Sequence, residues 1–574
     1  MRPNPETITP GGYFLGMTTP KLILGPLLRY AGASDATVWV ETDTPCTVEV
    51  TAGGGPHRSP TFAVEGHHYA LVRVADLEPA SFYEYEVALD GERVWPEPGL
   101  DLPPSAIKTT GWDGELVLAY GSCRVAVPHE PPYTLERGTV RRGGLGGKRY
   151  ERDALFALAH EMMGGPRESW PDALLMLGDQ IYADEPSPGT LDFIRSRRDP
   201  EHPPGVADFE EYTRLYWDAW GHPTMRWLLS TVPSTMIFDD HDVHDDWNAS
   251  QTWVETMRSK PWWEERSVGA FSSYWIYQHL GNLSPEELEA DDTFRRVLSS
   301  TDATRTLREF AYDADRQVEG TRWSYHRDFG RVRLIVADSR AGRVLTPGKR
   351  SMLDEREWEW LREKASGDFD HLLFGTSMPL LLSPGFHHLE AASEAICDGS
   401  LGRPAARFGE FMRQLLDLEH WPAFHASFTD LTTLLRSVAS GERSDGKPPA
   451  SVVVLSGDVH HGYLAKATLG DGAHSPVYQA VGSPLRNPLG APERLFMRAG
   501  WTSPVERFGR WLARLSGVTE PPVRWRLDHR APWFDNHVST IRLSGRRATL
   551  RVEKTTAEDA GDPHLEKLLE RELT

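Results

Sequence analysis

Four short apolar runs in this 574-residue chain each lead to a side chain that can bind a metal ion or carry a proton. The runs are residues 116–120, 173–177, 235–238 and 452–455, and the residues that follow them include Cys123, Asp179, Asp240 and Asp458. Evenly apolar runs of this length are typical of parallel strands that are buried on both faces. In open α/β sheets, binding sites form at the carboxyl ends of such strands. We therefore expect the four segments to converge on one site.

The order of local patterns predicts two domains. Residues 21–108 alternate apolar and polar side chains between Gly, Pro and Asp breaks, which is typical of a β-sandwich. Within them, residues 77–85 resemble a corner of fibronectin type III-like domains. After Trp112, strands alternate with helical patterns, as in a layered α/β domain. We place the domains at residues 1–110 and 111–574, and we expect the chain to end in a charged helix, residues 563–573.

Composition limits the class of partner. The net charge of −21 argues against bulk binding of nucleic acid, although a bound metal ion would still allow an anionic substrate. No run of about 20 apolar residues predicts a membrane span. The first residues contain neither an apolar export segment nor a twin-arginine pair, so we expect a cytoplasmic protein. Three cysteines are too few for a disulfide framework.

The residue types at the strand ends favour two different metal positions. Asp179 has two oxygens that can bridge two cations, and Tyr182 lies three residues further on, where its phenol can reach the same ion. With the thiolate of Cys123 and the imidazole of His460, this set of donors favours iron, and a phenolate favours Fe(III). Asp240 and Asp458 add only oxygens, which suit Ca²⁺, Mn²⁺ or Mg²⁺.

A pair of metal ions predicts attack at phosphorus. Two cations about 3.5–4 Å apart can generate a metal-bound hydroxide and stabilise the charge that develops on a phosphate ester. His241 directly follows one predicted ligand and could protonate the leaving oxygen. Arg124 and His461 each lie beside another predicted ligand and could contact the phosphoryl group. The expected reaction is hydrolysis of a small phosphate ester.

Other interpretations exist for each residue alone. A single Asp after a strand is more often a turn or helix cap, and a single buried cysteine is usually a small packing residue. Asp338 and Arg340 most simply form a structural pair near a sheet edge. The coincidence of four strand ends nevertheless favours a site. Two alternatives stay open. One is an all-helical HD-type phosphohydrolase that uses the pairs His241-Asp242 and His244-Asp245, and the other is a binding or scaffold protein whose metal site is degenerate.

Taken together, these segments resemble the alkaline phosphatase D (PhoD-like) family of metallophosphatases. The segments that match, in the order of the family, are residues 121–123, 178–184, 239–243, 338–340, 353–361 and 457–460. The resemblance implies a four-layered α/β/β/α metallophosphatase domain, preceded by a small β-sandwich, that hydrolyses phosphomonoesters or phosphodiesters with iron and calcium. It further implies the ligands of each ion. These are Cys123, Asp179, Tyr182 and His460 for the iron, and Asp179, Asp240 and Asp458 for the second ion. The chain departs from the family at Asp245 and Asp246, where relatives often have Asn.

Overall fold

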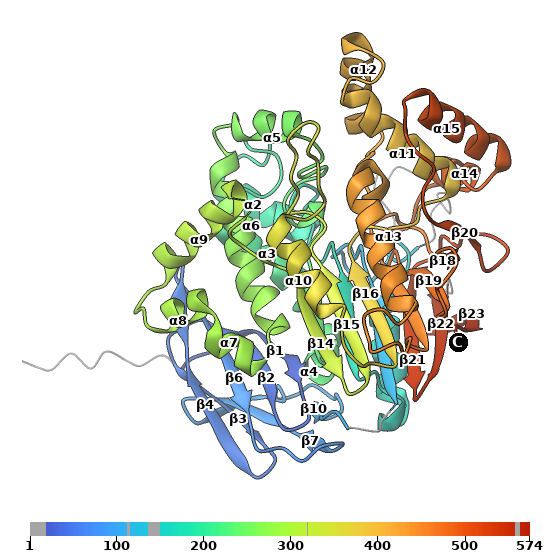
Figure 1. The fold of residues 1–574 in the computed structure, drawn as a ribbon. Coiled ribbons are helices and arrows are strands. Elements are labelled where there is room, and N and C mark those ends of the chain that lie inside the picture. The colour runs from blue at the N-terminus through green and yellow to red at the C-terminus, as the bar shows by residue number, and fades with distance from the viewer. Residues whose placement is uncertain (1–18, 112–114, 136–149, 318, 557–562) are drawn as a thin grey trace, which may run out of the picture.

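The computed structural model describes residues 19–111, 115–135, 150–317, 319–556 and 563–574 (Figure 1). The N-terminal segment on which the expectation of a missing export signal depends lies outside these ranges. Among the described residues, no helix has the length and apolar character needed to cross a membrane.

The N-terminal part is built from antiparallel strands. Its strands are β1 (Leu22–Ala31), β2 (Ala36–Thr42), β3 (Thr47–Ala52), β4 (Gly55–Pro60), β5 (Phe62–Val64), β6 (His67–Val74), β7 (Phe82–Glu84), β8 (Glu86–Leu89), β9 (Glu92–Trp95) and β10 (Ala106–Lys108). They form two four-stranded sheets, ordered β1-β2-β6-β5 and β4-β3-β8-β9, and the pair β10-β7. In β3, buried and more exposed residues alternate, as expected for a sheet with one face on a core. The predicted sandwich-like, β-rich N-terminal region is thus present.

The rest of the chain contains two larger mixed sheets. One has six strands: β13 (Ser234–Ile237), β12 (Ala173–Leu177), β11 (Leu116–Gly121), β21 (His537–Ser544), β22 (Arg547–Thr555) and β23 (Leu565–Glu572), in that order. The other has seven: β14 (Tyr325–Phe329), β15 (Val332–Ala337), β16 (His371–Thr376), β17 (Ser451–Ser456), β19 (Val477–Val481), β18 (Tyr463–Thr468) and β20 (Arg524–Leu527). The strands β11, β12 and β13 are mutually parallel, and so are β15, β16, β17 and β19.

The described chain also contains fifteen α-helices, some of which cover the outer faces of these sheets in the predicted α/β/β/α order of layers (Figure 1). They are α1 (Ala154–Gly164), α2 (Pro188–Arg197), α3 (Phe209–Trp220), α4 (Pro223–Thr231), α5 (Gln251–Arg258), α6 (Trp263–Tyr277), α7 (Pro285–Ala290), α8 (Asp292–Leu298), α9 (Thr304–Arg316), α10 (Glu355–Lys364), α11 (Pro384–Cys397), α12 (Arg403–Leu415), α13 (His425–Ala439), α14 (Ala491–Ala499) and α15 (Ser503–Leu515). The four predicted apolar runs are β11, β12, β13 and β17, and they are buried along their whole length. Three of them lie in one sheet and β17 lies in the other, so the site has to form where the two sheets meet.

The N-terminal strands share a hydrophobic core with the larger region. Leu24, Trp39 and Tyr69 belong to the same buried cluster as the strands and helices that follow. Arg29, which is fully buried, donates from its guanidinium to the backbone carbonyls of Ser234, Tyr277 and Gln278. Each of these contacts crosses the boundary that we predicted near residue 110, and that boundary stays a prediction.

The prediction of a C-terminal helix was wrong. Residues Leu565–Glu572 form β23, which pairs antiparallel with β22 at the edge of the six-stranded sheet. The segment is rich in Glu and Leu, which favour a helix locally, but the hydrogen bonds of the sheet outweigh that propensity. Its charged side chains are also a common means of protecting an edge strand from further pairing.

Candidate metal centre

The strand ends meet because two glycines allow unusually close contact. A Cβ atom on Gly178, after β12, would lie 2.6 Å from the Cβ of Asp239, after β13. A Cβ atom on Gly457, after β17, would lie 2.2 Å from the Oγ of Ser122, after β11. The same hydroxyl accepts a hydrogen bond from the backbone N–H of Asp458 at 3.1 Å. This second contact joins the ends of strands from the two sheets.

Four predicted ligands have a left-handed backbone. The φ angles are +55° at Cys123, +51° at Asp179, +67° at Asp458 and +49° at His460. Residues other than glycine rarely adopt this region, and the cost is of order 1–3 kcal/mol each. Strain of this kind gathers at sites where the backbone must aim side chains in a fixed direction.

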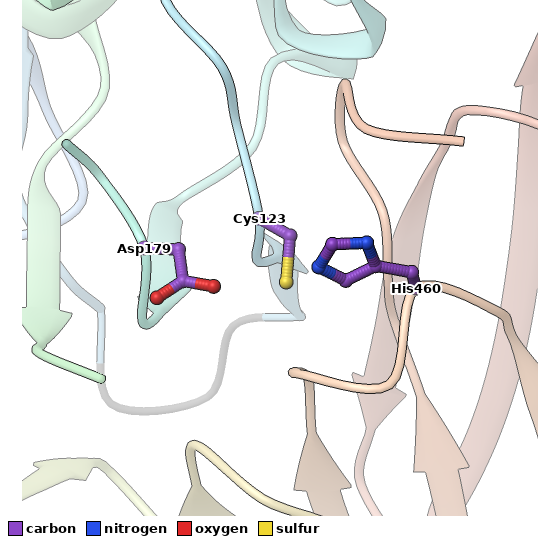
Figure 2. Close-up of side chains that lie close together, drawn as sticks. All are labelled: Cys123, Asp179 and His460. Atoms are coloured by element: carbon purple, nitrogen blue, oxygen red, sulfur yellow. The ribbon is translucent and has the colours of Figure 1, made fainter. Parts of the chain in front are cut away.

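The first group of donors is Cys123, Asp179 and His460. One ligand atom from each lies within 4.8 Å of the others (Figure 2). The thiol is buried and lies 3.2 Å from the hydroxyls of both Ser122 and Ser483. One sulfur, one nitrogen and one carboxylate donor make a set suited to a transition metal such as iron.

Tyr182 lies beside this group. Its side chain is buried, and its phenol oxygen accepts a hydrogen bond from Asn487 at 3.2 Å. Burial, followed by the charges of Asp179 and Cys123, raises the pKa of the phenol well above its ordinary value. A cation would therefore be needed to ionise it at this position. Its ring also contacts that of His241, with the two centroids 4.6 Å apart.

Carboxylates dominate the second group of donors. Asp239, Asp240 and Asp458 bring ligand atoms within 4.8 Å of one another. A further set with the same spacing contains Asp179, Asp240 and His241. Because Asp179 belongs to this set and also to the sulfur-containing group, the two groups adjoin. This geometry agrees with the predicted bridging position of Asp179.

Buried negative charge shows that the site fits a cation. Burial, with the nearby charges of Asp239 and Asp240, raises the pKa of Asp179 well above its ordinary value, although His241 opposes this. Among the described residues, the Oδ1 atom of Asp179 has no hydrogen-bond partner. A buried carboxylate oxygen without a partner is costly unless a cation binds it. The types of donor atom and the Oδ1 atom of Asp179 without a partner together indicate a site that fits metal ions.

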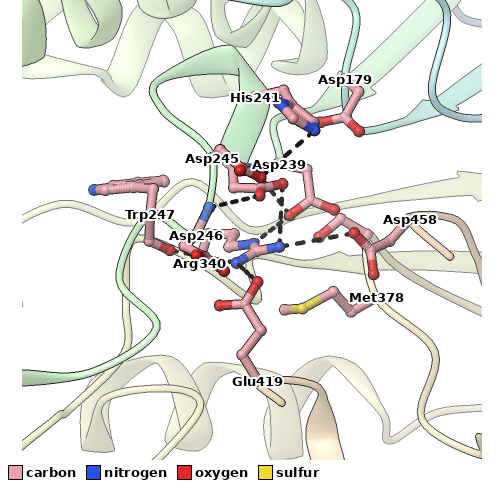
Figure 3. A network of polar contacts seen from close by, with 12 residues as sticks. Asp179, Asp239, His241, Asp245, Asp246, Trp247, Arg340, Met378, Glu419 and Asp458 are labelled. Atoms are coloured by element: carbon pink, nitrogen blue, oxygen red, sulfur yellow. Dashed lines mark hydrogen bonds and ion pairs between the residues drawn. The ribbon is translucent and has the colours of Figure 1, made fainter. Parts of the chain in front are cut away.

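Arg340 supplies a fixed positive charge beside the second group (Figure 3). It follows β15, is 1% exposed, and forms ion pairs with Asp239, Glu419 and Asp240, the last at 3.2 Å. A longer contact of 3.8 Å reaches Asp458. The guanidinium therefore offsets part of the carboxylate charge, while Glu419 also pairs with a second buried arginine, Arg343.

Two histidines are held in place by carboxylates. The Nδ1 atom of His241 lies 3.0 Å from Asp184, so the other ring nitrogen is the one left for chemistry. His420 lies between Glu390, 2.7 Å from Nδ1, and Asp458, 2.8 Å from Nε2. Burial opposes a charge on His420, yet these two carboxylates raise its pKa well above the ordinary value. His420 therefore fixes one oxygen of Asp458.

Arg124 and His461 are placed differently. His461 lines the same cavity as Asp458 and stacks on Phe534 with centroids 5.5 Å apart. The buried guanidinium of Arg124 instead binds Asp153 at 2.7 Å and the carbonyl of Ala219, and it lines a separate cavity. Its predicted contact with a phosphoryl group stays a prediction that these contacts do not support.

Several residues near the metal groups were not singled out from the sequence as parts of the site. They are Asp184, Arg340, Glu390, Glu419 and His420. Arg340 was expected only to pair with Asp338, and its backbone N–H does donate to that carboxylate at 2.8 Å. His420 follows no apolar run, and no sequence signal pointed to it.

Comparison with known proteins gives a family and a fold. The PhoD-like phosphatase family matches residues 145–495, and a domain of unknown function, DUF7800, matches residues 19–107. No curated protein matches the chain. A solved structure described as PhoD is 12% identical, with a TM-score of 0.58, over 96% of this chain and 92% of that one. The purple acid phosphatase PPD1 from yellow lupin (Lupinus luteus) seeds is 10% identical over 95% and 74%, with a TM-score of 0.48. At such low identity, the likeness to PhoD shows the fold alone.

Proposed function

Because the chain belongs to the PhoD-like phosphatase family, we propose that this metallophosphatase hydrolyses phosphomonoesters, phosphodiesters or both. The observation that carries the proposal is the pair of adjoining donor groups. Asp179 lies within 4.8 Å of donors in the group that contains Cys123 and in the group that contains Asp240. Two cations held in adjoining positions would supply the clamp that two-metal phosphatases use.

The two groups would hold different ions. We assign iron to Cys123, Asp179, Tyr182 and His460, because thiolate, phenolate and imidazole suit a transition metal. We assign the second ion, Ca²⁺ or alternatively Mn²⁺ or Mg²⁺, to Asp179, Asp240 and Asp458. When bound, such a pair supplies an activated water and offsets the charge on the phosphoryl oxygens.

His241 is the residue that we assign to the leaving group. Its Nδ1–H donates to Asp184, which fixes the ring and leaves Nε2 to give a proton to the departing oxygen. Asp184 is thus a positioning residue. His461 lines the same cavity and would contact the phosphoryl group or the rest of the substrate.

The fold separates the alternatives. An HD-type phosphohydrolase is all-helical, whereas the predicted ligands here follow strands of two large sheets. A scaffold protein with a degenerate metal site would be expected to have lost donors. Here the donor atoms of Cys123, Asp179 and His460 lie within 4.8 Å of one another, and so do those of Asp239, Asp240 and Asp458.

Replacement of Asp179 tests the activity. Asp179→Asn should lower hydrolysis of p-nitrophenyl phosphate and of bis-p-nitrophenyl phosphate by more than about 100-fold, because even residues that only support a ligand cost 10- to 100-fold. Elemental analysis of the variant should also show less bound metal than in the wild type. Asp328→Asn is the matched control. Asp328 lies on β14, far from the site, where its carboxylate pairs with Arg333. Full activity in Asp179→Asn would contradict the proposal.

A second experiment tests the identity of the iron ligands. Phenolate bound to Fe(III) gives a visible charge-transfer band, so Tyr182→Phe should abolish the band in iron-loaded protein. Tyr463→Phe should leave it intact, because that phenol lines the cavity but donates to the carbonyl of Leu381. Equal spectra for the two variants would exclude Tyr182 as a ligand.

A further inference from the structure

A cavity of about 630 Å³ opens directly beside the proposed metal centre. At one end it is lined by Asp240, Asp458 and His460. Away from them the lining is apolar and includes Phe386, Leu389, Phe408, Met412, Phe496 and Leu512. Its volume is in the range of sites that enclose most of a small organic ligand. A simple phosphate ester has no group that would need this apolar space.

Four helices form the apolar walls. They are α11, α12, α14 and α15, which stand together above the strand ends on one side of the molecule (Figure 1). Phe386 of α11 stacks on Phe496 of α14, with centroids 4.7 Å apart. Gly509 allows α15 to approach α11, since a Cβ atom there would lie 2.7 Å from the carbonyl oxygen of Gly385. Close packing of these helices therefore fixes the walls of the cavity.

The apolar surface continues from the cavity onto the outside of these helices. We define the apolar rim as the large hydrophobic side chains that α12, α14 and α15 expose. They are Phe408, Phe411, Leu415, Leu495, Phe496, Phe508, Trp511 and Leu515, each more than half exposed. Phe408, Phe496 and Phe508 belong both to the rim and to the cavity lining. An exposed patch of this extent marks a surface that binds an apolar partner.

Exposed arginines lie on the same three helices as the rim. Exposed Arg403 and Arg407 lie on α12, Arg498 on α14 and Arg507 on α15. They stand out in a chain whose net charge is −21. Amphipathic helices with Trp, Phe and Leu on one side and arginines beside them are typical of segments that lie in the interface of an anionic lipid layer. The charges of the arginines complement those of phosphate headgroups.

Building on the proposed phosphoesterase activity, we propose that the substrate is a lipid phosphate ester taken from a membrane surface. Its phosphoryl group binds at the metal centre, its apolar chain lies in the cavity, and the rim rests on the lipid layer. A second copy of the chain is the other candidate partner for the rim. It fits less well, because covering Phe408, Phe496 and Phe508 would also cover the mouth of the cavity.

The first test varies the length of the substrate chain. We would measure kcat/KM for the methyl, butyl and hexyl esters of p-nitrophenyl phosphate below their micelle concentrations. Each methylene that becomes buried should raise kcat/KM about fourfold, so the hexyl ester should exceed the methyl ester by more than about 100-fold. Equal values for the three esters would overturn this inference and leave the phosphoesterase activity standing. If metal-loaded protein hydrolysed neither these diesters nor p-nitrophenyl phosphate, the proposed function itself would be refuted.

A pair of variants on α15 locates the effect. Leu512 lines the cavity, whereas Leu515 is 54% exposed and lies outside the lining. Leu512→Gln should lower the hexyl-to-methyl ratio at least about tenfold, and Leu515→Gln should leave the ratio unchanged. The ratio cancels any loss of folded protein. An unchanged ratio in Leu512→Gln would show that the alkyl chain of the ester binds elsewhere and would overturn its assignment to the cavity.

The second test concerns the lipid surface. Metal-loaded protein should sediment with vesicles of phosphatidylglycerol and phosphatidylcholine, and the double variant Phe411→Ser/Trp511→Ser should bind at least about tenfold more weakly. Trp217→Ser is the control, since Trp217 is an exposed tryptophan of α3, away from the rim. Failure of the wild type to sediment with vesicles would overturn the proposal. So would a dimer in sedimentation velocity that the double variant dissociates.

Discussion

The buried guanidinium of Arg340 gives the sharpest prediction about stability. It is 1% exposed and pairs with Asp239, Asp240 and Glu419. Removing one partner of a buried ion pair costs about 3–5 kcal/mol, because the remaining charge stays buried without compensation. Arg340→Met should therefore lower the free energy of unfolding by about this amount. Arg340→Lys keeps the charge but loses the planar fork, so we expect an intermediate loss.

A matched arginine provides the control. Arg331 also pairs with two carboxylates, Asp368 and Asp370, but its side chain is 46% exposed. Exposed pairs contribute about 0–1 kcal/mol, so Arg331→Met should have little effect. The assay is urea unfolding in excess chelator, so that ion binding does not differ between variants. Tryptophan fluorescence and circular dichroism should give the same transition if the free energies are to be compared.

The comparison between the two arginines decides the outcome. A difference of at least about 2 kcal/mol between Arg340→Met and Arg331→Met corresponds to roughly a 30-fold difference in the unfolding equilibrium. Equal effects would refute the argument that the carboxylates depend on Arg340 for charge compensation.

Three further predictions concern other parts of the molecule. Arg29→Met should lower the free energy of unfolding of the whole chain by about 1–3 kcal/mol or more, because it leaves buried carbonyls without a donor. For the same reason, residues 111–574 expressed alone should aggregate, and a well-folded fragment would contradict the shared core. Asp184→Asn should slow the hydrolysis of alkyl esters by about 100-fold. It should slow the hydrolysis of p-nitrophenyl esters much less, because p-nitrophenolate leaves without a proton. Equal losses for the two kinds of ester would exclude a role of Asp184 in positioning His241. Iron and calcium, each at about 100 times its Kd, should each stabilise the wild type by about 2.7 kcal/mol in thermal unfolding, and should stabilise Asp179→Asn by clearly less. An equal gain in the two proteins would place the ions elsewhere.

The local sequence predicted that Cys123, Asp179, Asp240 and Asp458 follow buried strands, and the structure places them there, while their roles as ligands stay a prediction. The strands β11, β12, β13 and β17 are buried along their whole length, and a Gly or Asp lies at the end of each strand or within two residues after it. Arg340 and His420 could not be assigned to the site in this way. Their carboxylate partners come from segments 30 to 101 residues away, and such pairings depend on how the two sheets pack.

Long-range pairing also explains what the sequence misplaced or left open. The helical propensity of residues Leu565–Glu572 is a local property, whereas β23 exists because β22 offers it an edge. Alternation in the N-terminal strands indicates which side chains are buried, but not that Trp39 and Tyr69 pack against the larger region. A boundary drawn from local pattern alone therefore says little about whether the two parts unfold separately.

The left-handed backbone at Cys123, Asp179, Asp458 and His460 has a consequence for how such a chain would change over generations. Glycine adopts these angles without strain, so one substitution at any of the four positions would relax a loop and delete a donor together. A descendant that no longer needed its ions would gain stability by accepting such glycines. Among descendants of this chain, inactive copies should then have the higher melting temperatures.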